Sequence, residues 1–331
     1  MILRVLAGLV MLAMATSVAE AASFDCKKAS TPFETAICTH PELSKADDLL
    51  AVAYATAIGG LSKPALALMQ KNQKAWLDFA QRSCTDDAEL PTRAYPDEQV
   101  ECLRSSFETR VRRLEQSRMW GGLRLYSVES YGVIPDTTAD ADAWNKVATR
   151  EVSVPRIDGS DAEAKAFAAF VAAHGPQAEG EQDETSDVQQ LATVDEVNAQ
   201  RISLVINNWW YGHGAAHGNY DISYAHFLRG EQRALEAADI FVGEGWEEQL
   251  GKLALAELDS TIEGGIWEES REDAAANASD PSRWNFSFEG LVIQYQPYEV
   301  TAYAYGAPTV TIPWAQLTDY LSADALSIAQ Y

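Results

Sequence analysis

The sequence has few cysteines and few basic residues for its length, and each shortage narrows what the protein can do. The 331 residues include four cysteines, all in the first third of the chain, and no two of them are spaced as CxxC. A zinc site of the usual spacing is therefore not expected. Lys and Arg number 25 against 49 Asp and Glu, so the net charge is -24. Such an acidic surface repels DNA, RNA and anionic lipid, which excludes a nucleic-acid partner.

Motifs for enzymatic chemistry are also missing. No G-x-S-x-G segment is present, so the sequence does not indicate an α/β-hydrolase. Acidic residues are numerous, but nothing distinguishes two of them as the pair of a glycosidase. We therefore predict a non-enzymatic protein with no catalytic residue, no cofactor and no bound metal.

Long apolar runs are confined to the N-terminus. Residues 1–21 combine Arg4, an apolar run to about Ala19 and the small residues Ala19 and Ala21, which is the pattern of a cleavable signal peptide. The run is too short for a comfortable membrane span. We predict cleavage after Ala21, a periplasmic or secreted protein and no membrane span in the mature chain.

The charge is unevenly distributed along the chain. Residues 1–119 hold 14 basic and 15 acidic residues, whereas residues 120–331 hold 11 basic and 34 acidic ones. A length of 331 residues is typical of about two domains. We place them at 22–118 and 119–331, and we predict an acidic, solvated loop at about 175–190.

Three helices are predicted in the first domain. Apolar residues recur at helical spacing from Pro41, and the pattern ends at Gly59 and Gly60. The same spacing occurs over 63–84 and over 96–116. This region should fold as a small helical unit.

The four cysteines of an exported protein should form two disulfides, for which three pairings exist. Cys84 closes the second predicted helix and Cys102 lies near the start of the third, so the chain between them turns back on itself. From this topology we predict a Cys84–Cys102 bridge, which leaves Cys26 to pair with Cys38.

The same region resembles a known family. The segments FDCKKASTPFETAIC, PELSKADDLLAVAY, QKAWLDFAQRSC and ECLRSSFETRVRRLE, in this order, resemble the LprI-type lysozyme inhibitors. The match covers about 24–114 and all four cysteines. It also includes Glu34, Asp47, Tyr54, Gln73, Trp76, Arg82 and Arg110. We expect Trp76 and Tyr54 to be core aromatics, and Glu34 and Arg82 to form ion pairs or helix caps.

The second domain should be an α+β fold with a mainly antiparallel sheet packed by helices. Residues 127–200 are acidic and turn-rich, and we predict only one helix there, over 161–174. Alternating apolar residues predict strands in RISLVINNWWYG and NYDISYAHFL. A helix over 245–262 and three short strands, at 285–288, 291–295 and 309–312, follow.

The stretch YGHGAAHGNY connects the first two of these strands. His213 and His217 are four residues apart, but Gly212, Gly214 and Gly218 disfavour the helix that would place them on one face as metal ligands. We predict a tight turn in which His217 is hydrogen-bonded to backbone. A metallohydrolase that uses both histidines is the alternative.

An aromatic loop, QPYEVTAYAYGAP, joins the last two strands. Tyrosines are frequent in protein-recognition loops because they supply contact area at a low cost in conformational entropy. The candidate partner-binding residues are His217, Tyr298, Glu299, Tyr303 and Tyr305. Alternatively, Tyr298 and Tyr303 pack against the edge of the sheet.

The second domain also resembles a lysozyme-binding protein. ISLVINNWWYGHGAAHG, RALEAADIF and FEGLVIQYQPYEVTAYAYGAPTVTIPW are similar to the extracellular domain of the anti-sigma factor RsiV. Together the two resemblances imply a protein that binds and inhibits lysozyme, a cationic muramidase that the acidic domain would attract. An alternative is a cell-envelope protein that binds peptidoglycan glycans by stacking sugars on Trp209, Trp210, Trp284 and the tyrosines.

Overall fold

The computed structural model describes residues 22–140, 142–143, 145–177 and 182–330. The predicted signal peptide, residues 1–21, and residues 178–181 of the predicted acidic loop lie outside these ranges. Among the described residues, no helix is both long enough and apolar enough to span a membrane.

The N-terminal region is helical, as predicted, and two disulfides cross-link it. Its helices are α1 (Pro32–Thr39), α2 (Pro41–Ile58), α3 (Lys63–Ser83) and α4 (Asp97–Leu114). Glu34 closes a capping box with Thr31 at the start of α1, so its expected capping role is confirmed. The predicted pairing is also confirmed, because Cys26 is bonded to Cys38 and Cys84 to Cys102.

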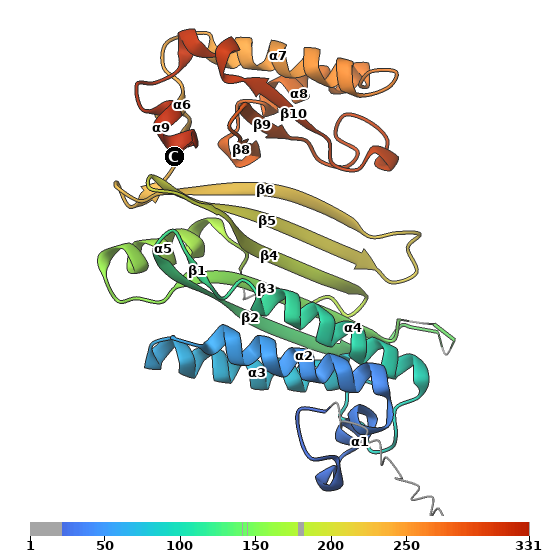
Figure 1. Cartoon of the computed structure of the whole chain (residues 1–331). Helices are drawn as coiled ribbons and strands as arrows, with labels where there is room; N and C mark the ends of the chain where they lie inside the picture. Colours follow the sequence, from blue (N-terminus) through green and yellow to red (C-terminus); the bar gives the residue numbers. More distant parts are fainter. Residues whose placement is uncertain (1–21, 141, 144, 178–181, 331) are drawn as a thin grey trace, which may run out of the picture.

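A seven-stranded sheet forms the middle of the molecule (Figure 1). Its strands follow one another in sequence order, and all neighbours are antiparallel except β3 and β4, which are parallel. Helix α5 (Ala162–His174) lies between these two strands in the chain and makes the crossover that a parallel pair requires. The strands are β1 (Met119–Trp120), β2 (Leu123–Pro135), β3 (Val147–Ile157), β4 (Ser186–Val197), β5 (Arg201–Gly212), β6 (Asn219–Leu228) and β7 (Arg233–Ala234).

The sequence predictions missed the three long strands β2, β3 and β4, and the two-residue strands β1 and β7 as well. β2, β3 and β4 lie largely in the region that we expected to be turn-rich, and β4 begins at Ser186, inside the expected acidic loop. β2 buries Glu129 as well as apolar residues, and β4 alternates little because most of its residues are half-buried on both faces. A strand without alternation gives no period-2 signal.

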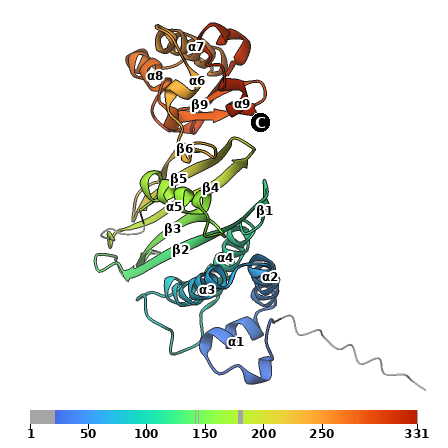
Figure 2. The same cartoon turned by 90° about the vertical axis from the view of Figure 1, so that its left-hand side faces the viewer.

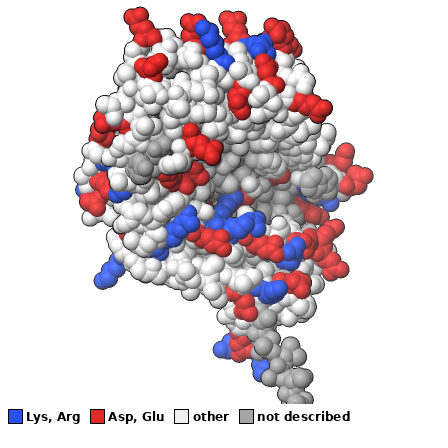
Figure 3. Space-filling view, turned by 45° about the horizontal axis from the view of Figure 1, so that its top comes forward, with Lys and Arg blue, Asp and Glu red and all other residues white. Residues whose placement is uncertain are grey.

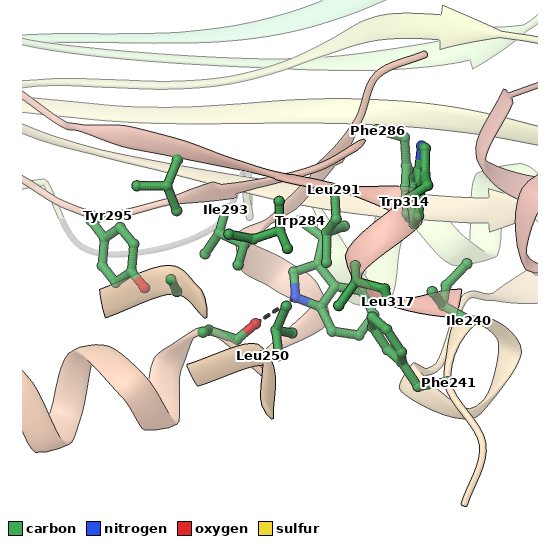
Figure 4. Packing of buried hydrophobic residues seen from close by; sticks show 14 of the residues in the cluster. Ile240, Phe241, Leu250, Trp284, Phe286, Leu291, Ile293, Tyr295, Trp314 and Leu317 are labelled. Atoms are coloured by element: carbon green, nitrogen blue, oxygen red, sulfur yellow. Dashed lines mark hydrogen bonds between the residues drawn. The ribbon is translucent and has the colours of Figure 1, made fainter. Parts of the chain in front are cut away.

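The C-terminal unit adds a second, three-stranded sheet with helices. It contains α6 (Ala237–Ile240), α7 (Trp246–Thr261), α8 (Arg271–Asn277), β8 (Trp284–Phe286), β9 (Gly290–Gln294), β10 (Thr309–Pro313) and α9 (Ala325–Gln330). Figure 4 shows Trp284 inside its core, close to Leu250 and Phe241. Trp284 is fully buried, and its Nε1 donates a hydrogen bond to the carbonyl of Ala278. It is therefore a core residue, and the sugar stacking that the alternative function assigned to it is wrong.

Helices α1 to α4, which we call the helical module, lie on one side of the central sheet, and the C-terminal unit lies on the other (Figures 1 and 2). Tyr126, Val133 and Val147 of β2 and β3 belong to the same buried cluster as the N-terminal helices. Helix α5 packs in a separate cluster with Phe227 and the apolar side chains of β4 and β5. The helical module therefore shares its core with the sheet.

A buried hydrogen-bond chain attaches the C-terminal unit to the sheet. Arg201 Nε donates to Ser203 Oγ at 2.8 Å, and the Ser203 hydroxyl lies 2.8 Å from His226 Nδ1. His226 Nε2 lies 2.8 Å from the Trp284 carbonyl, which can only accept, so the ring proton is on Nε2. Burial, and to a smaller extent the nearby Arg201, lower the pKa of His226 to about 3, so this histidine is neutral.

Candidate functional site

The predicted turn and the predicted aromatic loop meet in space, although about 80 residues separate them. β5 and β6 form an antiparallel hairpin whose tip is residues 213–218, as predicted. The ring of His217 stacks on Tyr303, with 4.2 Å between ring centroids and 20° between ring planes. Tyr303 Oη donates a hydrogen bond of 2.8 Å to the Gly218 carbonyl. The hairpin tip and the loop thus form one surface.

We call the residues of this surface the aromatic cluster. Tyr298 and Tyr220 lie beside Tyr303, at centroid distances of 5.2 Å and 6.4 Å. Tyr305 ends the same short helical turn as Tyr303, and its Oη donates to the Glu263 carbonyl at 3.2 Å. Tyr298 and Tyr305 are 49% and 48% exposed, and His217 is exposed as well. The cluster consists of His217, Tyr220, Tyr298, Tyr303 and Tyr305.

Two glycines and one strained residue shape the cluster. Gly214 has φ +80, and a Cβ at Gly218 would lie 2.8 Å from Trp209 Nε1, so both positions require glycine. Tyr298 has φ +65, a backbone conformation that costs a residue with a side chain roughly 1 kcal/mol. Because glycine would fit there without this cost, the tyrosine side chain itself is a candidate for a functional role.

Glu299 shapes the loop from within. It forms a 2.7 Å ion pair with Arg283 and accepts hydrogen bonds from Asn277 Nδ2 and from the Gln296 amide. Its side chain is 13% exposed. The structure therefore gives this predicted contact residue a positioning role.

The two histidines of the hairpin face different partners. His217 Nδ1 is hydrogen-bonded to the Gly218 carbonyl at 2.8 Å, as we expected for a turn. His213 Nδ1 donates to Asp136 Oδ2 at 2.6 Å, and this bond is the main reason why the pKa of Asp136 falls to about 2. In the described part of the chain, no three His, Cys, Asp or Glu residues are grouped as metal ligands would be. The structure therefore does not bring His213 and His217 together as a pair of metal ligands.

The opposite end of the same sheet face carries buried charges that the sequence did not reveal. Arg110 forms an ion pair with Glu129 in which both side chains are almost fully buried. Its guanidinium also donates to Asn72 Oδ1 and Gln73 Oε1, at 3.0 Å each, and lies 5.9 Å from the centre of the Trp76 ring. The family residues Gln73, Trp76 and Arg110 thus meet where the helices join the sheet. Trp76 is a core aromatic, as expected.

A single row of side chains connects these charges with the aromatic cluster. Directly paired residues on neighbouring strands point to the same face of a sheet. Tyr131 pairs with Glu151, Glu151 with Gln189, Gln189 with Trp209 and Trp209 with Tyr220. The row crosses five strands, from the helical module to the hairpin. Both ends of the row therefore belong to one face.

Comparisons with known proteins fall on the two ends of the chain. Residues 26–114 match the family model of the lysozyme inhibitor LprI, and residues 238–315 match DUF3298, a protein family of unknown function. No curated protein matches the chain.

Two solved structures of DUF3298 family members are similar to it. One, from Bacteroides fragilis, is 16% identical, with a TM-score of 0.49, and the match covers 64% of this chain and 99% of that one. The other, from Pseudomonas aeruginosa, is 14% identical, with a TM-score of 0.42, and the match covers 63% and 98%. The chain therefore carries an LprI lysozyme inhibitor domain at its N-terminus and a DUF3298 domain at its C-terminus.

Proposed function

We propose that this is an exported, non-enzymatic protein that binds and inhibits lysozyme-type muramidases. The observation that supports this most is the match of residues 26–114 to a family of lysozyme inhibitors. Two disulfides suit an oxidising compartment, so we place the mature protein in the periplasm or outside the cell after cleavage at Ala21.

We further propose that the aromatic cluster contacts the enzyme and covers its substrate cleft. Exposed tyrosines on a loop fixed by hydrogen bonds lose little entropy on binding, which is the usual property of interface hot spots. Tyr298 and Tyr305 are exposed, and Tyr303 is held by the Gly218 carbonyl. His217 extends the surface from the hairpin, and Glu299 holds the loop in shape.

Charge supports the same partner. In the view of Figure 3, acidic side chains are spread over much of the surface, and several basic ones lie in a band across the middle, next to acidic groups. The net charge of -24 would accelerate the encounter with a cationic enzyme, and added salt would weaken this effect.

The test is the clearing of a suspension of bacterial cell walls by a cationic lysozyme, with and without the purified mature chain. We expect the rate of clearing to fall as the chain approaches molar excess. Unchanged clearing at a large excess would refute the proposed inhibition. Sedimentation of the chain with purified peptidoglycan, without enzyme, separates inhibition from the alternative in which the chain coats the wall and protects it.

A further inference from the structure

A cavity of about 720 Å³ lies between helix α4 and the central sheet. Ser106, Thr109 and Arg113 line it from one face of the helix, and Thr149 and Glu151 line it from β3. Its volume falls in the range of sites for small molecules. The cavity lies at the junction of the helical module and the sheet.

Covalent and ionic links fix its walls. The Cys84–Cys102 bond joins two of the lining residues. Arg113 Nη1 lies 2.8 Å from Glu151 Oε2, and this ion pair connects the helix with the sheet across the cavity. Burial is the main cause that raises the pKa of Glu151, and Arg113 opposes it. The cavity is therefore built into the fold before any ligand arrives.

The wall contains polar atoms that lack hydrogen bonds. Among the described residues, three buried side-chain atoms make no hydrogen bond of good geometry, namely Arg113 Nη1, Asn145 Oδ1 and His213 Nε2, although Arg113 Nη1 faces Glu151 in the ion pair above. Arg113 and Asn145 line the cavity, and His213 Nε2 lies 3.6 Å from Asp187, another lining residue. A buried polar atom without a hydrogen bond is destabilising, because it has lost its contacts with water. The wall thus offers the second N–H of Arg113 Nη1, beside the one that faces Glu151, and the carbonyl oxygen of Asn145; a peptide carbonyl can accept from the first and a peptide N–H can donate to the second.

The rim of the cavity is acidic. Five carboxylates and three cationic side chains line it. Lys146 pairs with Asp86, and Arg113 pairs with Glu151. Glu98 and Asp142 are exposed, and no described cation lies within ion-pair distance of either. An acidic rim of this kind favours a ligand with a positive side chain.

We propose that this cavity binds a short peptide segment that carries an arginine or lysine side chain. A main-chain carbonyl of the peptide accepts from Arg113, a main-chain N–H donates to Asn145, and the cation lies at Glu98 and Asp142. Binding here is separate from the proposed contact with lysozyme, because the cavity lies beside α4 over β3 and β4, whereas the aromatic cluster lies on the β5–β6 hairpin and the loop at 296–308.

The experiment is an NMR titration of the uniformly ¹⁵N-labelled mature chain with Gly-Arg-Gly, acetylated and amidated at its ends. We expect the amide signals of Thr109, Thr149 and Gln189 to shift, and capped Gly-Glu-Gly to bind at least about tenfold more weakly. Absence of shifts at about 10 mM peptide would overturn the proposal, and so would equal binding of the two peptides.

Two variants and one control variant locate the binding. Glu98→Gln should weaken the arginine peptide about twofold to fivefold, whereas Glu115→Gln, the same change just beyond the end of α4, should leave its affinity unchanged. Ser106→Trp should fill the cavity and abolish the shifts at Thr149 and Gln189. If Ser106→Trp does not fold, the comparison of Glu98→Gln with Glu115→Gln still tests the site. Equal affinity of these two variants for the arginine peptide would contradict the proposal.

Discussion

The helical module and the C-terminal unit are stabilised in different ways. The helical module has two disulfides, and part of its core is supplied by β2 and β3. The C-terminal unit has no cysteine and is stabilised by a large apolar cluster that includes five aromatic residues, Phe241, Trp284, Phe286, Tyr295 and Trp314. Both regions bury several aromatic residues, so the difference between them is that disulfides and two strands of the sheet supplement the core of the helical module.

The largest expected effect is in the C-terminal unit. Trp284→Ala should lower the free energy of unfolding by about 3–5 kcal/mol, because it leaves a cavity and removes the hydrogen bond to the Ala278 carbonyl. Urea unfolding measures this. Trp210→Ala is the control, because Trp210 is 41% exposed and its loss should cost far less. Similar losses for the two variants would contradict a core stabilised by packing.

The second effect is in the helical module. Replacing both Cys84 and Cys102 by serine opens a loop with a sequence separation of 18, which should cost about 3 kcal/mol. Urea unfolding of the double variant under oxidising conditions measures the loss. If the double variant had the same urea midpoint of unfolding as the wild type, the disulfide would not stabilise the helical module, and this difference between the two regions would be contradicted.

The third effect concerns His226, which links the central sheet to the C-terminal unit by hydrogen bonds. The pKa of His226 is about 3 in the folded chain and about 6.5 when unfolded, so the unfolded state binds the proton first as the pH falls. The resulting stability is present above pH 6.5 and is lost at lower pH. Between pH 7 and 5.5 we expect a loss of about 1 kcal/mol.

The control for this pH dependence is His226→Gln. Glutamine can donate to the Trp284 carbonyl and accept from Ser203, yet it does not titrate in this range. The variant should be less stable at pH 7, and the part of the pH dependence that histidine causes should disappear. Chemical unfolding at both pH values measures this. If the free energy of unfolding of His226→Gln falls from pH 7 to 5.5 as much as that of the wild type, the buried histidine does not cause the pH dependence.

The smallest effect separates stability from binding. Tyr298→Gly relieves the positive φ and should leave stability unchanged or raise it by up to about 1 kcal/mol, while removing an exposed ring from the aromatic cluster. Thermal unfolding and the cell-wall clearing assay measure the two properties. A variant that loses stability and inhibits as well as wild type would show that Tyr298 serves the fold alone.

The parts of the fold that follow from sequence are those with local signals. Helical spacing identified α2, α3, α4, α5 and α7, and the two disulfides could be paired because Cys84 ends one predicted helix and Cys102 lies near the start of the next. β2 gave no signal because it buries Glu129, whose partner Arg110 belongs to a different element. Burial of a charge depends on a partner that periodicity cannot identify.

The candidate site was predictable only in pieces. The hairpin tip and the aromatic loop were each singled out, but the stacking of His217 on Tyr303 is a contact between distant segments. The cavity beside α4 was missed entirely, because its lining residues, most of them polar, come from five separate helices and strands and from the loops between them. Because the helical module shares its core with β2 and β3, separating it from the sheet would expose that core, so the experiments use variants of the whole chain.

The most direct test of the central claim is the affinity of the whole mature chain for a cationic lysozyme, measured by calorimetry. We predict that binding weakens with added salt and that Tyr303→Ala lowers the affinity at least about tenfold. The control is Phe288→Ala, because Phe288 is 79% exposed and precedes β9, at the end opposite the aromatic loop, so its loss should have little effect. Equal affinity of wild type and Tyr303→Ala would contradict the role of the aromatic cluster, and absence of binding would contradict the proposed function itself.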